Sequence, residues 1–188
     1  MKNILLLGAT GSIGKSVLSV MSQNEEKFNL YGISFNKNID KAKEIISEFS
    51  PTYVYIDDMT CFSDQHSQKG CTYINGNSDL EELIRSDDID IIICATSGFA
   101  GLKATHIAAS TGKKILLANK ESIVAGGDLV LPIAKEYDSQ IVPIDSEHNA
   151  IFQCLSGENG TRDVQKITIT ASGGPFLNFT ISELKDVT

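Results

Sequence analysis

The stretch ILLLGATGSIG at residues 4–14 decides the fold of this chain. Its first four residues are apolar and run into Gly8, which is typical of a strand buried on both faces of a parallel sheet. Ile13, Val17 and Met21 then recur at helical spacing. The opening therefore predicts a strand, a tight turn that contains three glycines, and a helix.

Short apolar runs and helical patterns alternate through the next part of the chain. Further strands are expected at residues 28–34, 53–56, 89–94, 115–118 and 141–144. Helices are expected at residues 41–49 and 79–86, in a segment ending at residue 109, and at 128–137. Pro132 is placed in the first turn of the last helix, where proline is tolerated. This alternation predicts an α/β fold with a doubly wound, mostly parallel, Rossmann-like sheet.

The pattern changes near residue 145. Residues 166–170, KITIT, alternate as in a strand with one exposed face. We therefore expect one domain at residues 1–144 and the start of a second, α+β domain at residues 145–188. The second segment is too short to enclose a core of its own.

Composition narrows the class of partner. The 188 residues carry a net charge of −8 and no long run of Lys or Arg, which disfavours nucleic-acid binding. The apolar stretch near Met1 is too short for a signal peptide or a membrane span. The four cysteines form no C-x-x-C pair, a pattern typical of free thiols in the cytosol. We expect a cytoplasmic protein that binds a small metabolite, with no nucleic acid and no membrane.

The glycine turn at residues 8–14 aims backbone N–H groups and a helix N-terminus at one point, which suits a pyrophosphate. Residues 9–16, ATGSIGKS, also fit a relaxed P-loop, with Lys15 and Ser16 in the phosphate and Mg²⁺ roles and Asp145 as the second acid. Ala9 in place of a glycine argues against a P-loop, and so does Pro143 in a strand that a P-loop protein would pair on both sides. A dinucleotide is favoured.

The end of the second predicted strand indicates which dinucleotide. NAD-binding domains place an Asp or Glu there to accept hydrogen bonds from the ribose hydroxyls. This chain has Asn36, Lys37 and Asn38, with no acid and one cation, and a cation attracts a 2′-phosphate. NADPH is therefore favoured, although Lys37 taken alone is equally well explained as a solvated loop lysine.

Acidic residues follow the last predicted strand. Asp145 and Glu147 are two apart, so an extended backbone would place both carboxylates on one side, where they could bind Mg²⁺ or Mn²⁺. An aspartate that caps a helix, with an acid in the first turn, is the structural alternative. His148 follows directly, and a structural hydrogen bond is its expected role. Lys120, after the strand at residues 115–118, could hold an anionic substrate.

Four blocks of sequence together resemble the 1-deoxy-D-xylulose 5-phosphate reductoisomerase family. They are GATGSIG at 8–14, LANKES at 117–122, PIDSEHNAIFQ at 143–153 and ASGGPF at 171–176. The resemblance implies NADPH- and divalent-metal-dependent isomerisation and reduction of 1-deoxy-D-xylulose 5-phosphate to 2-C-methyl-D-erythritol 4-phosphate, in non-mevalonate isoprenoid biosynthesis. It implies an NADPH-binding domain at residues 1–144, the beginning of a catalytic domain at 145–188 and a homodimer, and it argues against the P-loop.

The resemblance also assigns roles by position. The cofactor is held by Thr10, Gly11, Ser12, Ile13, Asn36, Lys37, Asn38, Asn119 and Glu121. The substrate is bound by Lys120, Ser146, Glu147 and Ser172, and the metal by Asp145 and Glu147. Lys120 and Glu147 are the expected catalytic residues.

Two departures from the family pattern qualify these expectations. Asn36 stands where family members commonly have glycine. The family's chain also continues well past Thr188 and carries a third metal-binding Glu, a flap and further phosphate-binding residues there. We therefore expect the 188-residue chain to bind NADPH without turnover. Another NADP-linked aldehyde reductase and a non-catalytic nucleotide-binding module are the alternatives.

Overall fold

The computed structural model describes residues 1–63, 67–156, 160–168 and 174–187. The chain divides into two compact units, Met1–Asn149 and Ala150–Thr188. In the described residues no helix is long and apolar enough to cross a lipid bilayer. The first unit contains the sheet and is the part of the chain that positions the candidate site.

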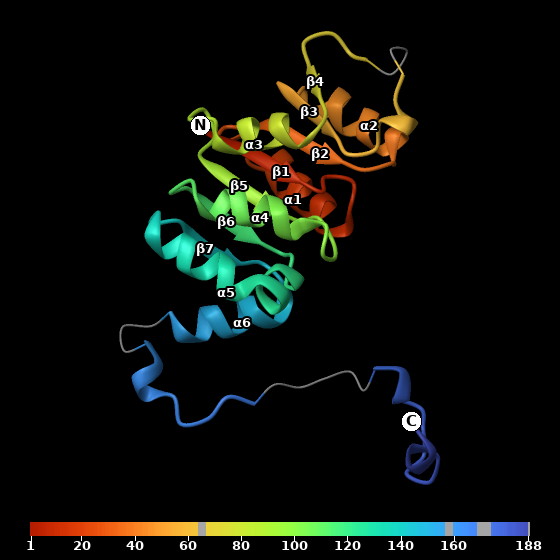
Figure 1. Ribbon diagram of the computed structural model, residues 1–188, viewed down its shortest axis with the longest axis vertical. Helices are drawn as coiled ribbons and strands as arrows, with labels where there is room; N and C mark the ends of the chain where they lie inside the picture. Colours follow the sequence, from red (N-terminus) through yellow and green to blue (C-terminus); the bar gives the residue numbers. More distant parts are fainter. Residues whose placement is uncertain (64–66, 157–159, 169–173, 188) are drawn as a thin grey trace. The chain divides into compact units, whose positions relative to one another are not determined.

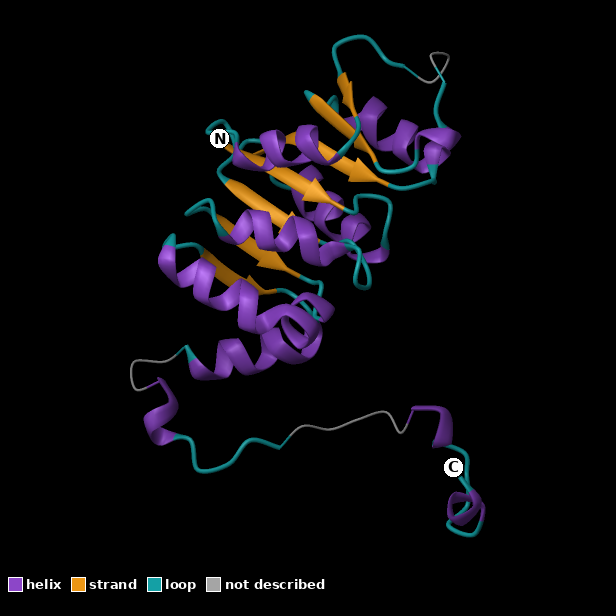
Figure 2. Ribbon diagram, viewed as in Figure 1, coloured by secondary structure: helices purple, strands orange, loops and turns teal. Residues whose placement is uncertain are grey.

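Seven parallel strands form one sheet in the described part of the first unit (Figures 1 and 2). Their bounds are β1 Lys2–Leu7, β2 Phe28–Phe35, β3 Tyr53–Ile56, β4 Thr72–Ile74, β5 Ile91–Cys94, β6 Lys114–Leu117 and β7 Gln140–Pro143. The strand order is β4-β3-β2-β1-β5-β6-β7. The direction of winding reverses between β1 and β5, so the predicted doubly wound fold is confirmed.

The helices have the following bounds: α1 Ser12–Ser22, α2 Ile39–Phe49, α3 Asn77–Arg85, α4 Gly101–Ala109, α5 Glu121–Glu136 and α6 Ser146–Leu155. Residues of α1 and α2 pack against one face of the sheet. Residues of α3, α4 and α5 pack against the other face (Figure 1). Leu5 and Leu6 of β1 point to opposite faces and are both fully buried, as the continuous apolar run predicted.

Helix α5 is longer than predicted, because it begins at Glu121 rather than near residue 128. Pro132 therefore lies inside the helix, and its placement in a first turn was wrong. Gly126 and Gly127 lower the helix propensity of the first half and concealed it in the sequence. A Cβ on Gly126 would lie 2.4 Å from Leu102 Cδ1 of α4, so the glycine allows the two helices to pack closely.

Two other differences concern short strands. Strand β4 was not predicted; it is an edge strand of three residues that pairs with β3. The strand expected at residues 166–170 is absent from its described part, residues 166–168, and the remaining two lie outside the described residues. An alternating segment forms a strand only when another strand lies beside it, and the described residues of this unit contain none.

The second unit contains most of α6 and three short 3₁₀ helices, η3 Gly160–Asp163, η4 Gly174–Phe176 and η5 Glu183–Asp186. The Phe176 and Phe179 rings pack edge to face with their centroids 5.5 Å apart. The described side chains of this unit are mostly exposed. The unit therefore has little core of its own, as its length predicted.

Candidate functional site

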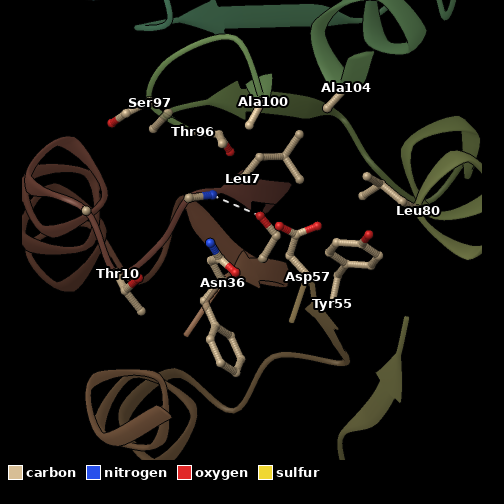
Figure 3. A pocket seen from close by; sticks show the side chains of 15 residues that line it. Leu7, Thr10, Asn36, Tyr55, Asp57, Leu80, Thr96, Ser97, Ala100 and Ala104 are labelled. Atoms are coloured by element: carbon tan, nitrogen blue, oxygen red, sulfur yellow. Dashed lines mark hydrogen bonds between the residues drawn. The ribbon is translucent and has the colours of Figure 1, made fainter. Parts of the chain in front are cut away.

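A cleft of about 340 Å³ opens at the carboxyl ends of the central strands (Figure 3). It is lined by Leu7, Gly8, Thr10, Gly11, Ser34, Phe35, Asn36, Tyr55, Asp57, Leu80, Ala95, Thr96, Ser97, Ala100 and Ala104. These residues lie at the carboxyl ends of β1, β2 and β3, in the loops that follow β1, β2, β3 and β5, or on α3 and α4, so the cleft spans the point where the strand order reverses. Open α/β sheets bind their ligands at this position.

The glycine turn forms one wall of the cleft. Gly8 has a φ of +84°, and a Cβ there would lie 2.7 Å from the backbone of Ala95. A Cβ on Gly14 would lie 2.3 Å from the carbonyl oxygen of Ala9. Helix α1 begins directly after Gly11, and no side chain caps it. Its first N–H groups are thus available to an anion, and the bare backbone leaves room for a pyrophosphate.

Ser34 holds the turn against the second strand, a role that the sequence analysis missed. Its hydroxyl oxygen accepts a hydrogen bond of 2.9 Å from the backbone N–H of Gly8 (Figure 3). Its carbonyl oxygen accepts a second bond of 2.9 Å from Ala9 N–H. Ser34 is 8% exposed. A serine near the end of a predicted strand, in the strand next to a glycine turn, was the available signal.

The residues after β2 divide between the cleft and the solvent. Asn36 lines the cleft. Lys37 is 72% exposed, and its ammonium lies 3.4 Å from a carboxylate oxygen of Asp58. The Asn38 side chain accepts a hydrogen bond of 3.2 Å from Lys41 N–H and thereby caps α2. The structure thus brings Asn36 into the cleft and gives Asn38 a capping role.

Asp57, at the end of β3, is a second residue that the sequence analysis missed. Its carboxylate lines the cleft beside Tyr55, and in Figure 3 the two side chains lie next to each other. Burial raises the pKa of Tyr55, and the neighbouring charge of Asp57 raises it further. The signal was the acidic residue that directly follows the strand at residues 53–56. No acid follows β2, as predicted, but the neighbouring strand supplies one.

Asn119 is part of a buried network of polar groups. Its side chain is 3% exposed and donates hydrogen bonds of 2.6 Å to Thr96 O and 2.7 Å to Gly98 O. Its Oδ1 accepts from the backbone N–H and the hydroxyl of Ser122, and that hydroxyl also lies 3.2 Å from Thr105 Oγ1. The amide therefore fixes the loop after β5, which lines the cleft.

A second hollow, of about 180 Å³, brings Lys120, Asp145 and His148 together with apolar residues of β6, α5 and β7. Asp145 Oδ1 accepts from His148 N–H at 3.1 Å, and Oδ2 lies 2.9 Å from His148 Nδ1. His148 thus has the structural hydrogen bond that was expected of it. Asp145 caps α6, so the prediction of an extended backbone from Asp145 to Glu147 was wrong.

The remaining predicted residues differ in accessibility. Ser146 and Glu147 are exposed in the first turn of α6, and Glu121 is exposed in the first turn of α5. Ser172 lies outside the described residues. Ser12 and Ile13 begin α1 beside the cleft.

The carboxylate oxygens of Asp145 and Glu147 are of the ligand type that a hard divalent cation prefers. Among the described residues no group of three or more His, Cys, Asp or Glu side chains is arranged to hold a metal ion. Mg²⁺, however, is commonly bound by one or two carboxylates, with substrate and water oxygens in the remaining positions. Asp145 and Glu147 supply that number of carboxylates.

Comparisons with known proteins agree on one family. Its model, described as 1-deoxy-D-xylulose 5-phosphate reductoisomerase, matches residues 4–127, and the model of the family's C-terminal domain matches residues 141–188. Reductoisomerases of Clostridium perfringens and Listeria innocua are 46% and 43% identical to this chain over all of its length. The chain spans about half the length of the curated relatives that it matches.

Solved structures show the same relationship. The reductoisomerase of Zymomonas mobilis in complex with NADPH superposes with a TM-score of 0.88 at 35% identity, over all of this chain and 50% of that one. A reductoisomerase in complex with NADPH, fosmidomycin and magnesium superposes with a TM-score of 0.86 at 35% identity, over all of this chain and 49% of that one. By sequence and by fold, this chain belongs to the 1-deoxy-D-xylulose 5-phosphate reductoisomerase family.

Proposed function

We propose that this chain supplies the cofactor-binding domain and two metal ligands of an NADPH- and divalent-metal-dependent reductoisomerase. The whole enzyme converts 1-deoxy-D-xylulose 5-phosphate to 2-C-methyl-D-erythritol 4-phosphate. The observation that carries the proposal is the cleft at the reversal of strand order, with the bare backbone of Gly8, Gly11 and Gly14 beside the N-terminus of α1. Family membership supports the choice of reaction.

The cleft's residues have distinct tasks in this proposal. Backbone N–H groups of Ser12 and Ile13 bind the pyrophosphate next to Thr10 and the bare backbone of Gly11, and the α1 dipole favours its negative charge. Asn36 contacts the adenosine side, together with Lys37 and Asn38 at the edge of the cleft. Asn119 and Glu121 lie toward the nicotinamide side. The cofactor, when bound, supplies a hydride, while these residues orient it and exclude water.

The second hollow holds the substrate end of the proposed site. Lys120 provides a positive charge for an anionic substrate, and Ser146 provides a hydroxyl group for a hydrogen bond. A substrate-binding role for Ser172, which lies outside the described residues, rests on the family resemblance alone. Asp145 and Glu147 would hold Mg²⁺ or Mn²⁺, which polarises a substrate carbonyl when bound. The bond to His148 orients the Asp145 carboxylate, as a partner of a metal ligand commonly does.

Four further features belong to the same proposal. The catalytic segment begins at residue 145, two residues after the end of β7, so that most of its first residues lie on α6. The whole enzyme acts in the cytoplasm as a homodimer. Its substrate is a small sugar phosphate rather than a nucleic acid, which the net charge of −8 supports.

The 188-residue chain is expected to bind NADPH without turning over substrate. The cleft with the glycine turn is present in this chain. The relatives, however, are about twice as long, and the hollow at Asp145 is lined by few polar groups. NADPH fluorescence titration measures binding, and NADPH oxidation with 1-deoxy-D-xylulose 5-phosphate and Mn²⁺ measures turnover. Absence of binding would remove the proposed function, and oxidation at the rate of full-length relatives would show that the chain carries a complete active site.

Asp145→Asn tests the metal role. The amide keeps an oxygen that can cap α6 but lacks the charge of the carboxylate, so the helix should remain folded. We expect Mn²⁺ affinity to fall about 10-fold or more, since one of two charged ligands is lost. Electron paramagnetic resonance of free Mn²⁺ provides the measurement. Asp128→Asn, on the exposed surface of α5, is the matched control and should bind Mn²⁺ as the wild type does; equal affinity of both variants would exclude Asp145 as a ligand.

A further inference from the structure

Lys41 joins helix α2 to the glycine turn. Its ammonium donates a hydrogen bond of 2.8 Å to the carbonyl oxygen of Thr10, a residue that lines the cleft. The two residues are 31 positions apart in the chain, and the bond is partly buried. Lys41 therefore places a positive charge at the edge of the cleft, on the side where β2 ends.

The surroundings of Lys41 leave this charge largely uncompensated. Lys41 lies in the first turn of α2, where the helix dipole disfavours a cation, and α1 begins two residues after Thr10. Two positive helix ends and an ammonium thus lie close together. Asp40 is the acidic residue in the first turn of α2. Within the described ranges, no carboxylate forms an ion pair with Lys41.

Lys37, the cation favoured from the sequence, is placed differently. It is largely exposed, and its ammonium lies 3.4 Å from Asp58. Hydrogen bonds from Thr60 lower the pKa of Asp58, and the nearby Lys37 lowers it further, so this carboxylate stays ionised and offsets the lysine charge. Less of the Lys37 charge is therefore available to a ligand than of the Lys41 charge.

We propose that Lys41 is the main residue that selects a cofactor with a 2′-phosphate over one without it. The inference rests on the proposed NADPH site and names the group that determines its specificity. An ammonium has three N–H donors, and the bond to Thr10 O uses one of them. The other two can bind a phosphomonoester beside the end of β2, where the adenosine ribose lies in dinucleotide-binding folds.

Lys41→Gln in the 188-residue chain tests the proposal. We expect the Kd for NADPH to rise about 10-fold or more, because a charge-assisted hydrogen bond to phosphate is lost. The Kd for NADH, which has no 2′-phosphate, should change by less than about 2-fold. Lys41→Arg keeps the charge and should retain most of the preference for NADPH. Fluorescence titrations give the Kd of each variant for NADPH and for NADH, and each value is compared with that of the wild type.

Two controls separate charge from structure. Lys43→Gln changes the charge of the same helix by the same amount, but Lys43 lacks the bond that Lys41 makes to Thr10, so the substitution should leave both Kd values unchanged. Lys37→Gln should reduce the preference for NADPH less than Lys41→Gln does. Lys41→Met, which keeps the aliphatic stem, repeats the test if the glutamine variant unfolds at a lower temperature.

Several results would overturn the inference. Equal weakening of NADPH and NADH binding by Lys41→Gln would mean that Lys41 only holds Thr10 in place. A larger loss of preference in Lys37→Gln would assign the 2′-phosphate to Lys37. If the wild type and Lys41→Gln bind NADPH equally well, the inference about Lys41 is refuted while the proposed function stands. Failure of the wild type to bind either cofactor would refute the proposed function as well.

Discussion

Replacing Gly14 by alanine will destabilise the first unit and weaken NADPH binding. The new Cβ would lie 2.3 Å from Ala9 O and 2.7 Å from Gly8 O, and both are backbone atoms that no rotamer change can move. Helix α1 must therefore shift away from the turn, which disrupts its packing on β1 and spreads the N–H groups that face the cleft. We expect a loss of about 3 kcal/mol in the free energy of unfolding.

Chemical denaturation with circular dichroism measures this loss, and NADPH titration of the folded variant should show at least about a 10-fold rise in Kd. Gly127→Ala in α5 is the matched control. Its Cβ would meet only side chains, at 3.7 Å or more, inside a helix. There the same substitution should stabilise the protein by about 0.5–1 kcal/mol. Two variants with the same sign and size of effect would contradict the steric argument.

Asn119→Ala is the second change with a large expected effect. It removes both hydrogen bonds to Thr96 O and Gly98 O, and it leaves the N–H of Ser122 with only its 3.3 Å bond to the backbone carbonyl of residue 119. These groups are buried or partly buried, so water compensates them poorly. We expect the free energy of unfolding to fall by about 3 kcal/mol. NADPH binding should weaken too, because the amide holds the loop that lines the cleft.

The comparison of stability with affinity decides what Asn119 does. Asn24→Ala is a suitable control, since that amide donates to Val20 O at the surface, and its loss should cost about 0.5 kcal/mol or less. If Asn119→Ala leaves stability unchanged but abolishes NADPH binding, Asn119 contacts the cofactor directly and the structural role is wrong. If both are unchanged, neither role holds. Denaturant titration and NADPH titration of the same preparations distinguish these cases.

Much of the sheet could be predicted because most of its strands can be recognised from their own residues. The run at residues 4–7 and the strand Tyr53–Ile56 are apolar, short and bounded by turn residues, which suffices to locate a buried parallel strand. Strand β4 could not be found in this way, since three edge residues leave almost no periodic pattern. The first half of α5 was missed because it contains Gly126, which disfavours a helix. The reason for this glycine is its close contact with Leu102 of α4, which the local sequence does not show.

The site was predictable to the extent that it depends on one segment of chain. The glycine turn and the acids after β7 were both located from the sequence. Ser34 and Lys41 were not, because each bonds to a partner far away in the chain. Asp57 was not, because it lines the cleft only through the packing of β3 beside β2. For Lys37 the sequence showed a cation but not the Asp58 carboxylate beside it.

The sequence by itself determined the strand, turn and helix around Gly8, and hence a fold that offers backbone N–H groups to an anion. The glycines could be interpreted from the sequence because the reason for each lies in nearby residues. Gly8 needs a positive φ, and Gly14 makes close contacts with the backbone of the same turn. The tertiary structure alone decided which charges face the cleft. Asp57 lines the cleft, Lys41 bonds to Thr10 at its edge, and the Lys37 ammonium lies beside the Asp58 carboxylate. Electrostatic interactions depend on distances in space, and only the packed sheet sets those distances.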